Sequence, residues 1–199
     1  MIETPRLLLR RFEPGDAPAL SVYRSEPEIA RYQAWPSPLS ADEADAAVRD
    51  YSKADPEQPG WFQYAIELKA DRSLAGDLGI NLHDNQMQAE LGVTLAPAFH
   101  GKGYALEALH GILGHLFDRG LHHVRATCDA RNTASARLLE RTGFELEGCS
   151  TGSLWQRGEW TDLLLFGLLA RNWKPQNFTS QAAEPSGRNV QPPLTSRAG

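Results

Sequence analysis

Two glycines separated by one residue, Gly101 and Gly103, lie directly before a segment with helical periodicity. The first N–H groups of a helix have no acceptor within the helix, and the helix dipole adds positive charge at that end. Glycine has no side chain, so a phosphate oxygen can approach its backbone closely. The pattern predicts a loop that binds a phosphate or diphosphate. The alternative is a plain glycine turn before a core helix.

Two common phosphate-binding motifs do not fit this loop. The P-loop requires GxxxxGK followed by Ser or Thr, whereas Lys102 lies between the glycines and is followed by Gly103. The dinucleotide fingerprint requires a third glycine where Leu106 stands. A nucleotide-binding enzyme is therefore disfavoured.

The segments that must position the loop read as strands and helices. Ser40 and Glu43 form a capping box that should begin a helix, and Asp16 and Asn132 are expected to cap two others. Predicted strands cover 6–12, 61–69, 74–82, 88–95, 124–128, 144–151 and 163–169, and predicted helices cover 16–25, 41–54, 103–119 and 133–142. Strands that first follow one another and then alternate with helices indicate an α/β fold with a mixed sheet.

Three glycines, at positions 76, 79 and 92, fall inside predicted strands. Glycine weakens a strand interior because it offers no side chain for packing. The three positions therefore indicate either β-bulges or places where another group comes close to the backbone.

Composition limits the classes of partner. The 199 residues, 41% of them hydrophobic, suit one domain over residues 1–174, and the Pro-rich, polar residues 175–199 are expected to form a flexible tail. A formal charge of -5 gives no basic field for nucleic acid or an anionic membrane. The two cysteines, Cys128 and Cys149, suit reduced structural thiols. With no apolar run of about 18 residues, we expect a soluble, cytoplasmic protein.

Three runs resemble, in order and spacing, the GNAT superfamily of acetyl-CoA-dependent N-acetyltransferases: ELGVTLAPAFHGKGYALEAL, CDARNTASARLLERTGFELEG and RGEWTDLLLFGLLARNW. The closest likeness is to the RimJ/RimL-like branch, which includes enzymes for ribosomal-protein N-termini, amino acids, polyamine-like amines and antibiotics, and the sequence does not choose among these acceptors. The opening TPRLLLRRFEPGDA is similar to that branch too, so the resemblance extends from Thr4 to Trp173. It implies a mixed, mostly antiparallel sheet, splayed in the middle, with helices on both faces.

The resemblance also implies a site for acetyl-CoA. The family signature is Gln or Arg, two residues, Gly, one residue, then Gly or Ala; Gly101 and Gly103 match it, and Ala98 departs from it. Val93 and Leu95 would pair with the pantetheine arm, and Gly92 beside them fits a local bulge. The implied cofactor-binding residues are Val93, Leu95, His100, Gly101, Lys102, Gly103, Tyr104, Ala105 and Asn132.

Candidate catalytic residues follow from the chemistry of amine acetylation. The attacking amine must lose its proton, and Glu90 is similar in position to the base of several family members; a solvated strand-edge carboxylate is the alternative. Ser135 could protonate the leaving thiolate, or only hydrogen-bond to its own helix. Asn132 is read either as a helix cap alone or as a cap that also contacts the cofactor.

The acceptor pocket and the overall activity complete the prediction. Gln33, Trp35 and Trp155 are expected to line the acceptor pocket. No HExxH or paired-histidine pattern occurs, so no metal is predicted. We expect direct transfer of acetyl to a primary amine, of a small molecule or a protein N-terminus, in a ternary complex. The alternative is a non-catalytic acyl-CoA sensor or interaction module on the same fold. Dimers are common in the family, so a homodimer is compatible with the resemblance.

Overall fold

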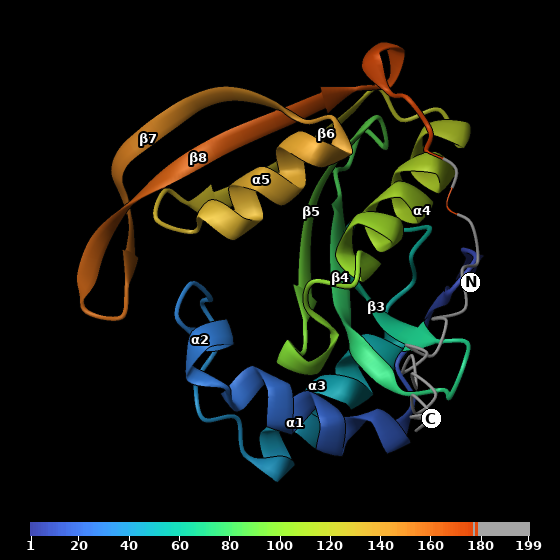
Figure 1. Ribbon diagram of the computed structural model, residues 1–199, viewed down its shortest axis with the longest axis vertical. Coiled ribbons are helices and arrows are strands. Elements are labelled where there is room, and N and C mark those ends of the chain that lie inside the picture. The colour runs from blue at the N-terminus through green and yellow to red at the C-terminus, as the bar shows by residue number, and fades with distance from the viewer. Residues whose placement is uncertain (177, 179–199) are drawn as a thin grey trace, which may run out of the picture.

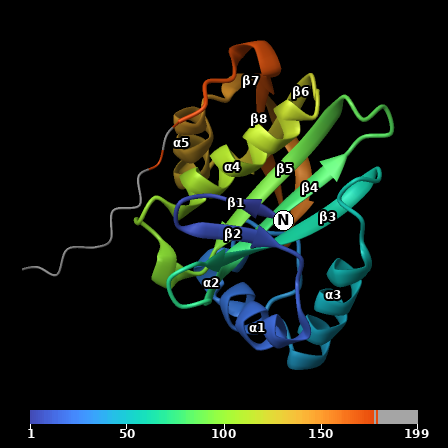
Figure 2. The ribbon, with the colours of Figure 1, turned by 90° about the vertical axis from the view of Figure 1, so that its right-hand side faces the viewer.

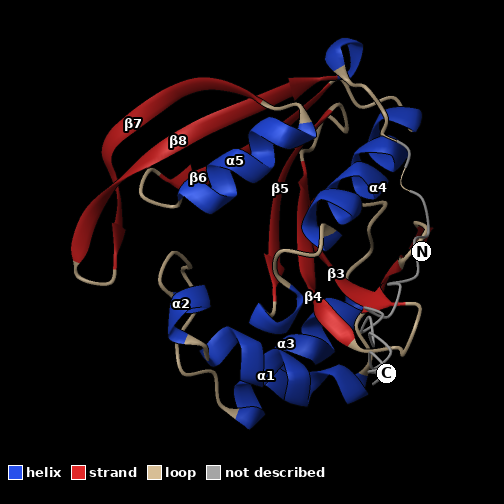
Figure 3. Cartoon of the chain, viewed as in Figure 1, coloured by secondary structure: helices blue, strands red, loops and turns tan. Residues whose placement is uncertain are grey.

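The computed structural model describes residues 1–176 and 178, which fold around one eight-stranded sheet (Figures 1 and 3). The strand order is β1-β2-β3-β4-β5-β6-β8-β7, and every neighbouring pair is antiparallel except the parallel pair β5–β6. The strands are β1 Ile2–Glu3, β2 Leu7–Arg10, β3 Gly60–Leu68, β4 Leu74–Leu82, β5 Gln88–Leu95, β6 His123–Asp129, β7 Glu145–Gln156 and β8 Glu159–Leu169. The predicted mixed, mostly antiparallel sheet is confirmed.

Helices cover both faces of this sheet (Figure 2). They are α1 Ala17–Ser25, α2 Pro27–Ala30, α3 Ala41–Lys53, α4 Tyr104–Asp118 and α5 Thr133–Thr142, with short 3-10 turns at Pro14–Asp16, Pro97–Phe99 and Ala170–Asn172. Ala65 packs with α1 and α3, whereas its neighbour Ile66 packs with α4. Consecutive strand residues point to opposite faces, so α1 and α3 lie on one face and α4 on the other.

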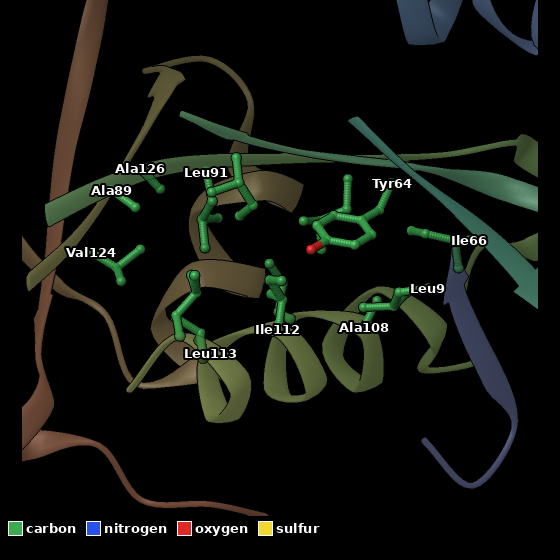
Figure 4. Close-up of a cluster of buried hydrophobic side chains, with 14 of the residues drawn as sticks. Leu9, Tyr64, Ile66, Ala89, Leu91, Ala108, Ile112, Leu113, Val124 and Ala126 are labelled. Carbon is green, nitrogen blue, oxygen red and sulfur yellow. The ribbon is translucent and has the colours of Figure 1, made fainter. Parts of the chain in front are cut away.

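The main core lies between α4 and the sheet (Figure 4). Leu109, Ile112 and Leu113 recur at helical spacing on α4 and are fully buried, facing Leu91 and Val124 among others. Each such side chain contributes roughly 1.5–3 kcal/mol by leaving water. This packing fixes α4, and with it the loop at its N-terminus, against the middle of the sheet.

The sheet opens in its middle. β5 and β6 pair from Gln88 opposite His123 to Leu91 opposite Ala126, while β5 remains paired with β4 as far as Leu95. Beyond Leu91 the two middle strands therefore diverge, which confirms the predicted splay.

The glycines in the strands have different roles from one another. Gly92 pairs regularly with Gly79, so the bulge expected at Gly92 is wrong. The irregularity lies instead between β3 and β4, opposite Ile66 and Glu67 and next to Gly76. A Cβ on Gly76 would lie 2.1 Å from the Thr94 carbonyl oxygen, so close backbone approach accounts for that glycine.

Two of the three predicted caps are confirmed. Ser40 and Glu43 form their capping box at the start of α3, and the Asn132 side chain accepts a hydrogen bond from the Ser135 N–H at the start of α5. The Asp16 carboxylate caps no helix at α1. It accepts from the Glu13 N–H at 2.8 Å, in a capping box of the 3-10 turn Pro14–Asp16, and from Arg10 at 2.7 and 2.9 Å in a buried ion pair.

The C-terminal strands are longer than predicted. β7 continues to Gln156 and β8 begins at Glu159, so the two form an extended hairpin at the edge of the sheet (Figure 1). Most of β7 is exposed on both faces, so its sequence lacks the alternation that marks a half-buried strand. The short elements α2 and β1 were also not predicted. Most of the expected tail, residues 177 and 179–199, lies outside the described residues.

No helix among residues 1–176 is long and apolar enough to cross a membrane. The expected cytoplasmic location stays a prediction, and so does the homodimer with which the resemblance is compatible.

Candidate active site

A cavity of about 460 Å³ lies where β5 parts from β6. Leu91, Gly92, Val93 and Thr94 line it from β5, and α5 lines it from the other side of the opening. Residues of β6, β3, β4, α1, α3, the segment after α2 and the turn before α5 complete its walls. The cavity therefore reaches from the opening in the sheet to the face covered by α1 and α3.

A pair of opposed glycines leaves part of the cavity wall without side chains. Gly79 and Gly92 are cross-strand partners and both line the cavity. A Cβ on Gly92 would meet no atom within 4 Å, whereas one on Gly79 would lie 2.7 Å from the Gln63 side-chain oxygen. Gly92 thus keeps space open that any other residue would fill.

The glycine loop lies at the start of α4, close to the end of β5. Gly101 and Gly103 have φ angles of 72° and 79°, which strongly favour glycine, and Gly103 is the N-cap residue of α4. The His100 ring is 2.9 Å from the Leu95 carbonyl oxygen, which ties the loop to the end of β5. Because the first N–H groups of α4 lie behind these glycines, the loop fits an anionic group.

Arg6 is a loop contact that the sequence reasoning did not identify. Its Nε donates to the Glu107 carboxylate at 2.6 Å, and its Nη1 donates to the Lys102 carbonyl oxygen at 3.1 Å. Arg6 belongs to TPRLLLR, which carried part of the family resemblance, but that motif alone assigned it no role.

Ser135, Asn132 and Cys128 lie together in the cavity wall. The Asn132 side-chain oxygen accepts from the Ser135 N–H at 3.1 Å and so caps α5. Burial raises the pKa of the Cys128 thiol, and the neighbouring Ser135 hydroxyl partly opposes that rise. Cys128, expected to be a structural thiol, therefore lies in the site beside Ser135.

Glu90 lies near the cavity but not in its lining. It is half-buried on β5, in register with Asn81 of β4 and Arg125 of β6. Because strand residues two apart share a face, Glu90 points to the same side of the sheet as Gly92, which does line the cavity. It is thus at the rim of the site.

Gln33 and Trp35 line the cavity, as does Arg24 of α1. The Arg24 guanidinium lies 4.4 Å from the centre of the Trp35 ring, and Trp35 Nε1 donates to the Arg24 carbonyl oxygen at 3.2 Å. Arg24 Nη1 also donates to the Tyr51 hydroxyl of α3 at 3.0 Å. Residues of α1, α3 and the segment after α2 thus form one polar and aromatic wall.

The carboxylate in this wall is Asp77 of β4, which is 2% exposed. It accepts hydrogen bonds from Tyr23 and Gln63 and forms an ion pair with Arg24 at 3.1 Å. Burial and the charge of Asp77 raise the pKa of the Tyr23 hydroxyl, so Tyr23 remains protonated and donates to Asp77. Asp77 is fully engaged by these partners and is a poor candidate for a base.

A second carboxylate in the cavity wall, Asp129, is also paired. Arg131 donates to it through Nε at 2.9 Å and Nη2 at 2.8 Å, and these hydrogen bonds hold the pKa of Asp129 below its usual range. Arg131 reaches Glu159 of β8 at 2.8 Å as well, which joins the hairpin to the turn before α5.

Trp155 is placed apart from Gln33 and Trp35. It is 58% exposed near the end of the β7–β8 hairpin, with its ring 5.4 Å from that of Trp160, and it is not among the lining residues. The hairpin nevertheless reaches the polar and aromatic wall of the cavity, because Gln156 donates to the Gln33 carbonyl oxygen at 2.9 Å.

The arrangement can bind an anion at the glycine loop and hold a second molecule against the polar and aromatic wall of the cavity. Among residues 1–176 and 178, no three His, Cys, Asp or Glu side chains gather closely enough to hold a metal ion. The site offers paired carboxylates, several hydroxyl groups that include the one on Ser135, and a free edge of β5. These groups suit transfer between two bound substrates.

Known structures share this fold. The acetyltransferase MccE of Microcin C7 self immunity, solved in complex with acetyl-CoA and AMP, superposes with a TM-score of 0.74. The match covers 82% of this chain and 92% of the MccE chain at 19% identity, so it describes the fold alone.

Sequence relatives are more informative. The uncharacterized N-acetyltransferase YnaD of Bacillus subtilis (strain 168) is 28% identical over 173 residues, which cover 86% of this chain and 98% of YnaD. An Escherichia coli (strain K12) enzyme, [ribosomal protein uS5]-alanine N-acetyltransferase, is 33% identical over 86 residues, or 43% of this chain and 44% of that enzyme. The predicted likeness to ribosomal-protein N-acetyltransferases is confirmed.

The family model described as an acetyltransferase (GNAT) domain matches residues 6–145. This range includes β5, the glycine loop, α4 and α5, which are the elements that surround the opening in the sheet. The chain belongs to the GNAT acetyltransferase family.

Proposed function

We propose that this protein transfers an acetyl group from acetyl-CoA to a primary amine while both substrates are bound. The observation that carries the proposal is the opening of the sheet beyond Leu91, which α5 lines and beyond which the glycine loop is tied to the end of β5. Direct attack of the amine on a thioester requires no nucleophile from the protein. The chain has to bind both substrates, orient them and move protons.

We assign the donor to the loop, the free edge of β5 and α5. Acetyl-CoA supplies an activated thioester at the end of an arm that carries a diphosphate. Residues 100–105 would bind the diphosphate through backbone N–H groups at the start of α4. Val93 and Leu95 would offer backbone groups to the arm, since this part of β5 is not paired with β6. The acetyl-CoA complex of MccE, which has the same fold, supports this choice of donor.

Ser135 and Glu90 are the proposed proton-transfer groups. Ser135 lies in the cavity wall at the start of α5, where its hydroxyl can donate a proton to the leaving thiolate. Glu90, at the rim on the same face as Gly92, would accept the proton of the amine through a water molecule. Asp77 is not chosen because Tyr23 and Arg24 already engage its carboxylate.

The charges around the acceptor favour an amine with a single positive charge. Asp77 and Asp129, the carboxylates of the described cavity wall, are both paired with arginines. A polyamine or aminoglycoside would bring further ammonium groups without a partner, and an unpaired buried charge costs several kcal/mol. A peptide α-amine, with a pKa of about 7.7–8.0 against about 10.4 for lysine, also needs less help from a base. We therefore propose a protein or peptide N-terminus as the acceptor.

The test is a calorimetric titration with acetyl-CoA, followed in the same sample by thiol-release assays. The amines would be peptide N-termini, amino acids, polyamines and aminoglycosides. We expect acetyl-CoA to bind and thiol to be released with peptide α-amines but not with polyamines. Binding without release for every amine would favour the acyl-CoA sensor. Release with polyamines alone would contradict the acceptor assignment.

A matched pair of variants tests the loop. Gly101→Asp places a carboxylate where the diphosphate is proposed to lie, so it should abolish acetyl-CoA binding. Gly120→Asp makes the same change at the other end of α4, where φ is 92°, and should bind normally. Equal binding by the two variants would show that the loop does not hold the donor.

A further inference from the structure

Arg6, in the turn between β1 and β2, contacts the glycine loop from the side. Its Nε donates to Glu107 at 2.6 Å, its Nη1 donates to the Lys102 carbonyl oxygen at 3.1 Å, and its guanidinium lies 4.5 Å from the centre of the Tyr104 ring. One side chain thus joins the N-terminal segment to the loop and to the first turn of α4, about a hundred residues away in sequence.

Glu107 is the charged group that Arg6 has to balance. Its side chain is fully buried and accepts hydrogen bonds from the Thr4 hydroxyl at 2.6 Å and the Arg6 backbone N–H at 2.8 Å, besides the Arg6 guanidinium. A negative charge in the first turn stabilises a helix. The same charge repels an anionic ligand at that helix end unless a cation neutralises it. Arg6 supplies this cation, and its Nη2 lies 3.5 Å from the position that a Cβ on Gly103 would take.

The contact with Lys102 fixes a peptide plane. In a trans peptide the carbonyl oxygen and the following N–H point in opposite directions. Because Arg6 holds the Lys102 carbonyl oxygen, the Gly103 N–H is directed away from Arg6. A loop that is already ordered loses less conformational entropy when its ligand binds.

We propose that Arg6 is a positioning residue for the diphosphate-binding loop. It neutralises Glu107 and orients the Lys102–Gly103 peptide, so that the N–H groups at the start of α4 face the donor's diphosphate. This inference rests on the proposed function, because it assumes that acetyl-CoA is the donor.

The experiment compares two donors, acetyl-CoA and S-acetylpantetheine, which lacks the diphosphate. Their dissociation constants are measured by calorimetry for the wild type and for Arg6→Met. We expect Arg6→Met to weaken acetyl-CoA binding about tenfold or more, the effect of losing a charge-assisted hydrogen bond. Binding of S-acetylpantetheine should change by less than about twofold, since it makes no contact that depends on the loop.

Arg10→Met is the matched control. Arg10 is also on the N-terminal strands and pairs with two buried carboxylates, Asp16 at 2.7 Å and Glu67 at 2.6 Å, but its partners are not in the loop. This variant should lower the melting temperature while it leaves the ratio of the two dissociation constants unchanged. An equal loss for both donors in Arg6→Met, or no loss, would overturn the role of Arg6.

Two further variants keep the test decisive if Arg6→Met folds poorly. Arg6→Met combined with Glu107→Gln leaves no unpaired buried charge, and it should fold while still binding acetyl-CoA more weakly than the wild type. Arg6→Lys keeps the positive charge but lacks the guanidinium group that donates to Glu107 and Lys102 at the same time. It should therefore bind acetyl-CoA more tightly than Arg6→Met and more weakly than the wild type. Wild-type affinity in the double variant would overturn the proposal. A wild type that does not prefer acetyl-CoA to S-acetylpantetheine would instead overturn the proposed function.

Discussion

Gly92 is the residue at which function can be separated most clearly from folding. Its strand pairing is regular and a Cβ there would touch nothing, so a side chain is compatible with the fold. The same side chain would extend into the cavity, where the two substrates are proposed to meet. We expect Gly92→Val to keep its melting temperature and to lose at least about tenfold in acetyl-transfer rate, because small displacements of reacting groups are costly. Circular dichroism and the thiol-release assay measure the two properties.

The control for this residue is Gly148→Val. Gly148 is also a strand glycine whose Cβ would meet no atom within 4 Å, but it lies on β7, outside the cavity wall. Its rate should equal that of the wild type. An active Gly92→Val enzyme would mean that the substrates do not use the space beside β5.

At the scale of elements, α5 tests whether Asn132 is only a cap. The side-chain oxygen of Asn132 holds the Ser135 N–H, while the residue also lines the cavity. Replacing a capping Asn with Ala costs about 1 kcal/mol, whereas Ser caps almost as well. We expect Asn132→Ala to lower the free energy of unfolding by this amount and Asn132→Ser to restore it. Urea denaturation provides the measurement.

Donor affinity then separates the two roles. If the amide of Asn132 also contacts the donor, as we expect from its place in the wall, Asn132→Ser should be stable and still bind acetyl-CoA more weakly than the wild type. Full affinity in Asn132→Ser would reduce Asn132 to a cap.

At the scale of the whole molecule, His110 should make stability sensitive to acid. It lies on α4, 9% exposed, against Trp173, and neither ring nitrogen has a hydrogen-bond partner among the described residues. Burial lowers its pKa in the folded protein. As the pH falls below about 6.5, the imidazole of His110 takes up a proton in the unfolded chain before it does so in the folded protein. The free energy of unfolding therefore decreases as the pH falls through this range.

The comparison with His110→Phe isolates this effect. As the pH falls below about 6.5, the wild type should lose more of its free energy of unfolding than the variant does. Urea denaturation at several pH values measures the difference. His122→Phe, at an exposed position, should behave like the wild type. Parallel pH curves for wild type and His110→Phe would contradict the prediction.

The parts of the molecule that could be predicted are those with local signals. The capping residues Ser40 and Asn132, the left-handed glycines Gly101 and Gly103 and the apolar spacing on α4 each fix their own segment. These segments, taken in order, were enough to indicate the mixed sheet and the loop at the start of α4.

The parts that could not be predicted depend on distant partners. Asp16 was expected to cap the helix α1, but its carboxylate accepts from the Glu13 N–H of the preceding 3-10 turn and pairs with Arg10. Nothing near Asp77 or Arg6 in the sequence indicates that the first joins Arg24 in a buried ion pair or that the second reaches Glu107. These partners are brought together by tertiary packing between residues far apart in the sequence, which short sequence patterns do not reveal.

The opening between β5 and β6 distinguishes the protein with an empty site from the protein with a bound ligand. Four residue pairs between β5 and β6, from Gln88–His123 to Leu91–Ala126, join strands β1 to β5 of the sheet to strands β6, β8 and β7. A ligand that hydrogen-bonds along the free edge of β5 takes the place of the missing neighbour strand. In the proposed complex, the arm of the donor therefore holds the two halves of the sheet together, and we expect the protein to be stiffer with acetyl-CoA or CoA bound than when the site is empty.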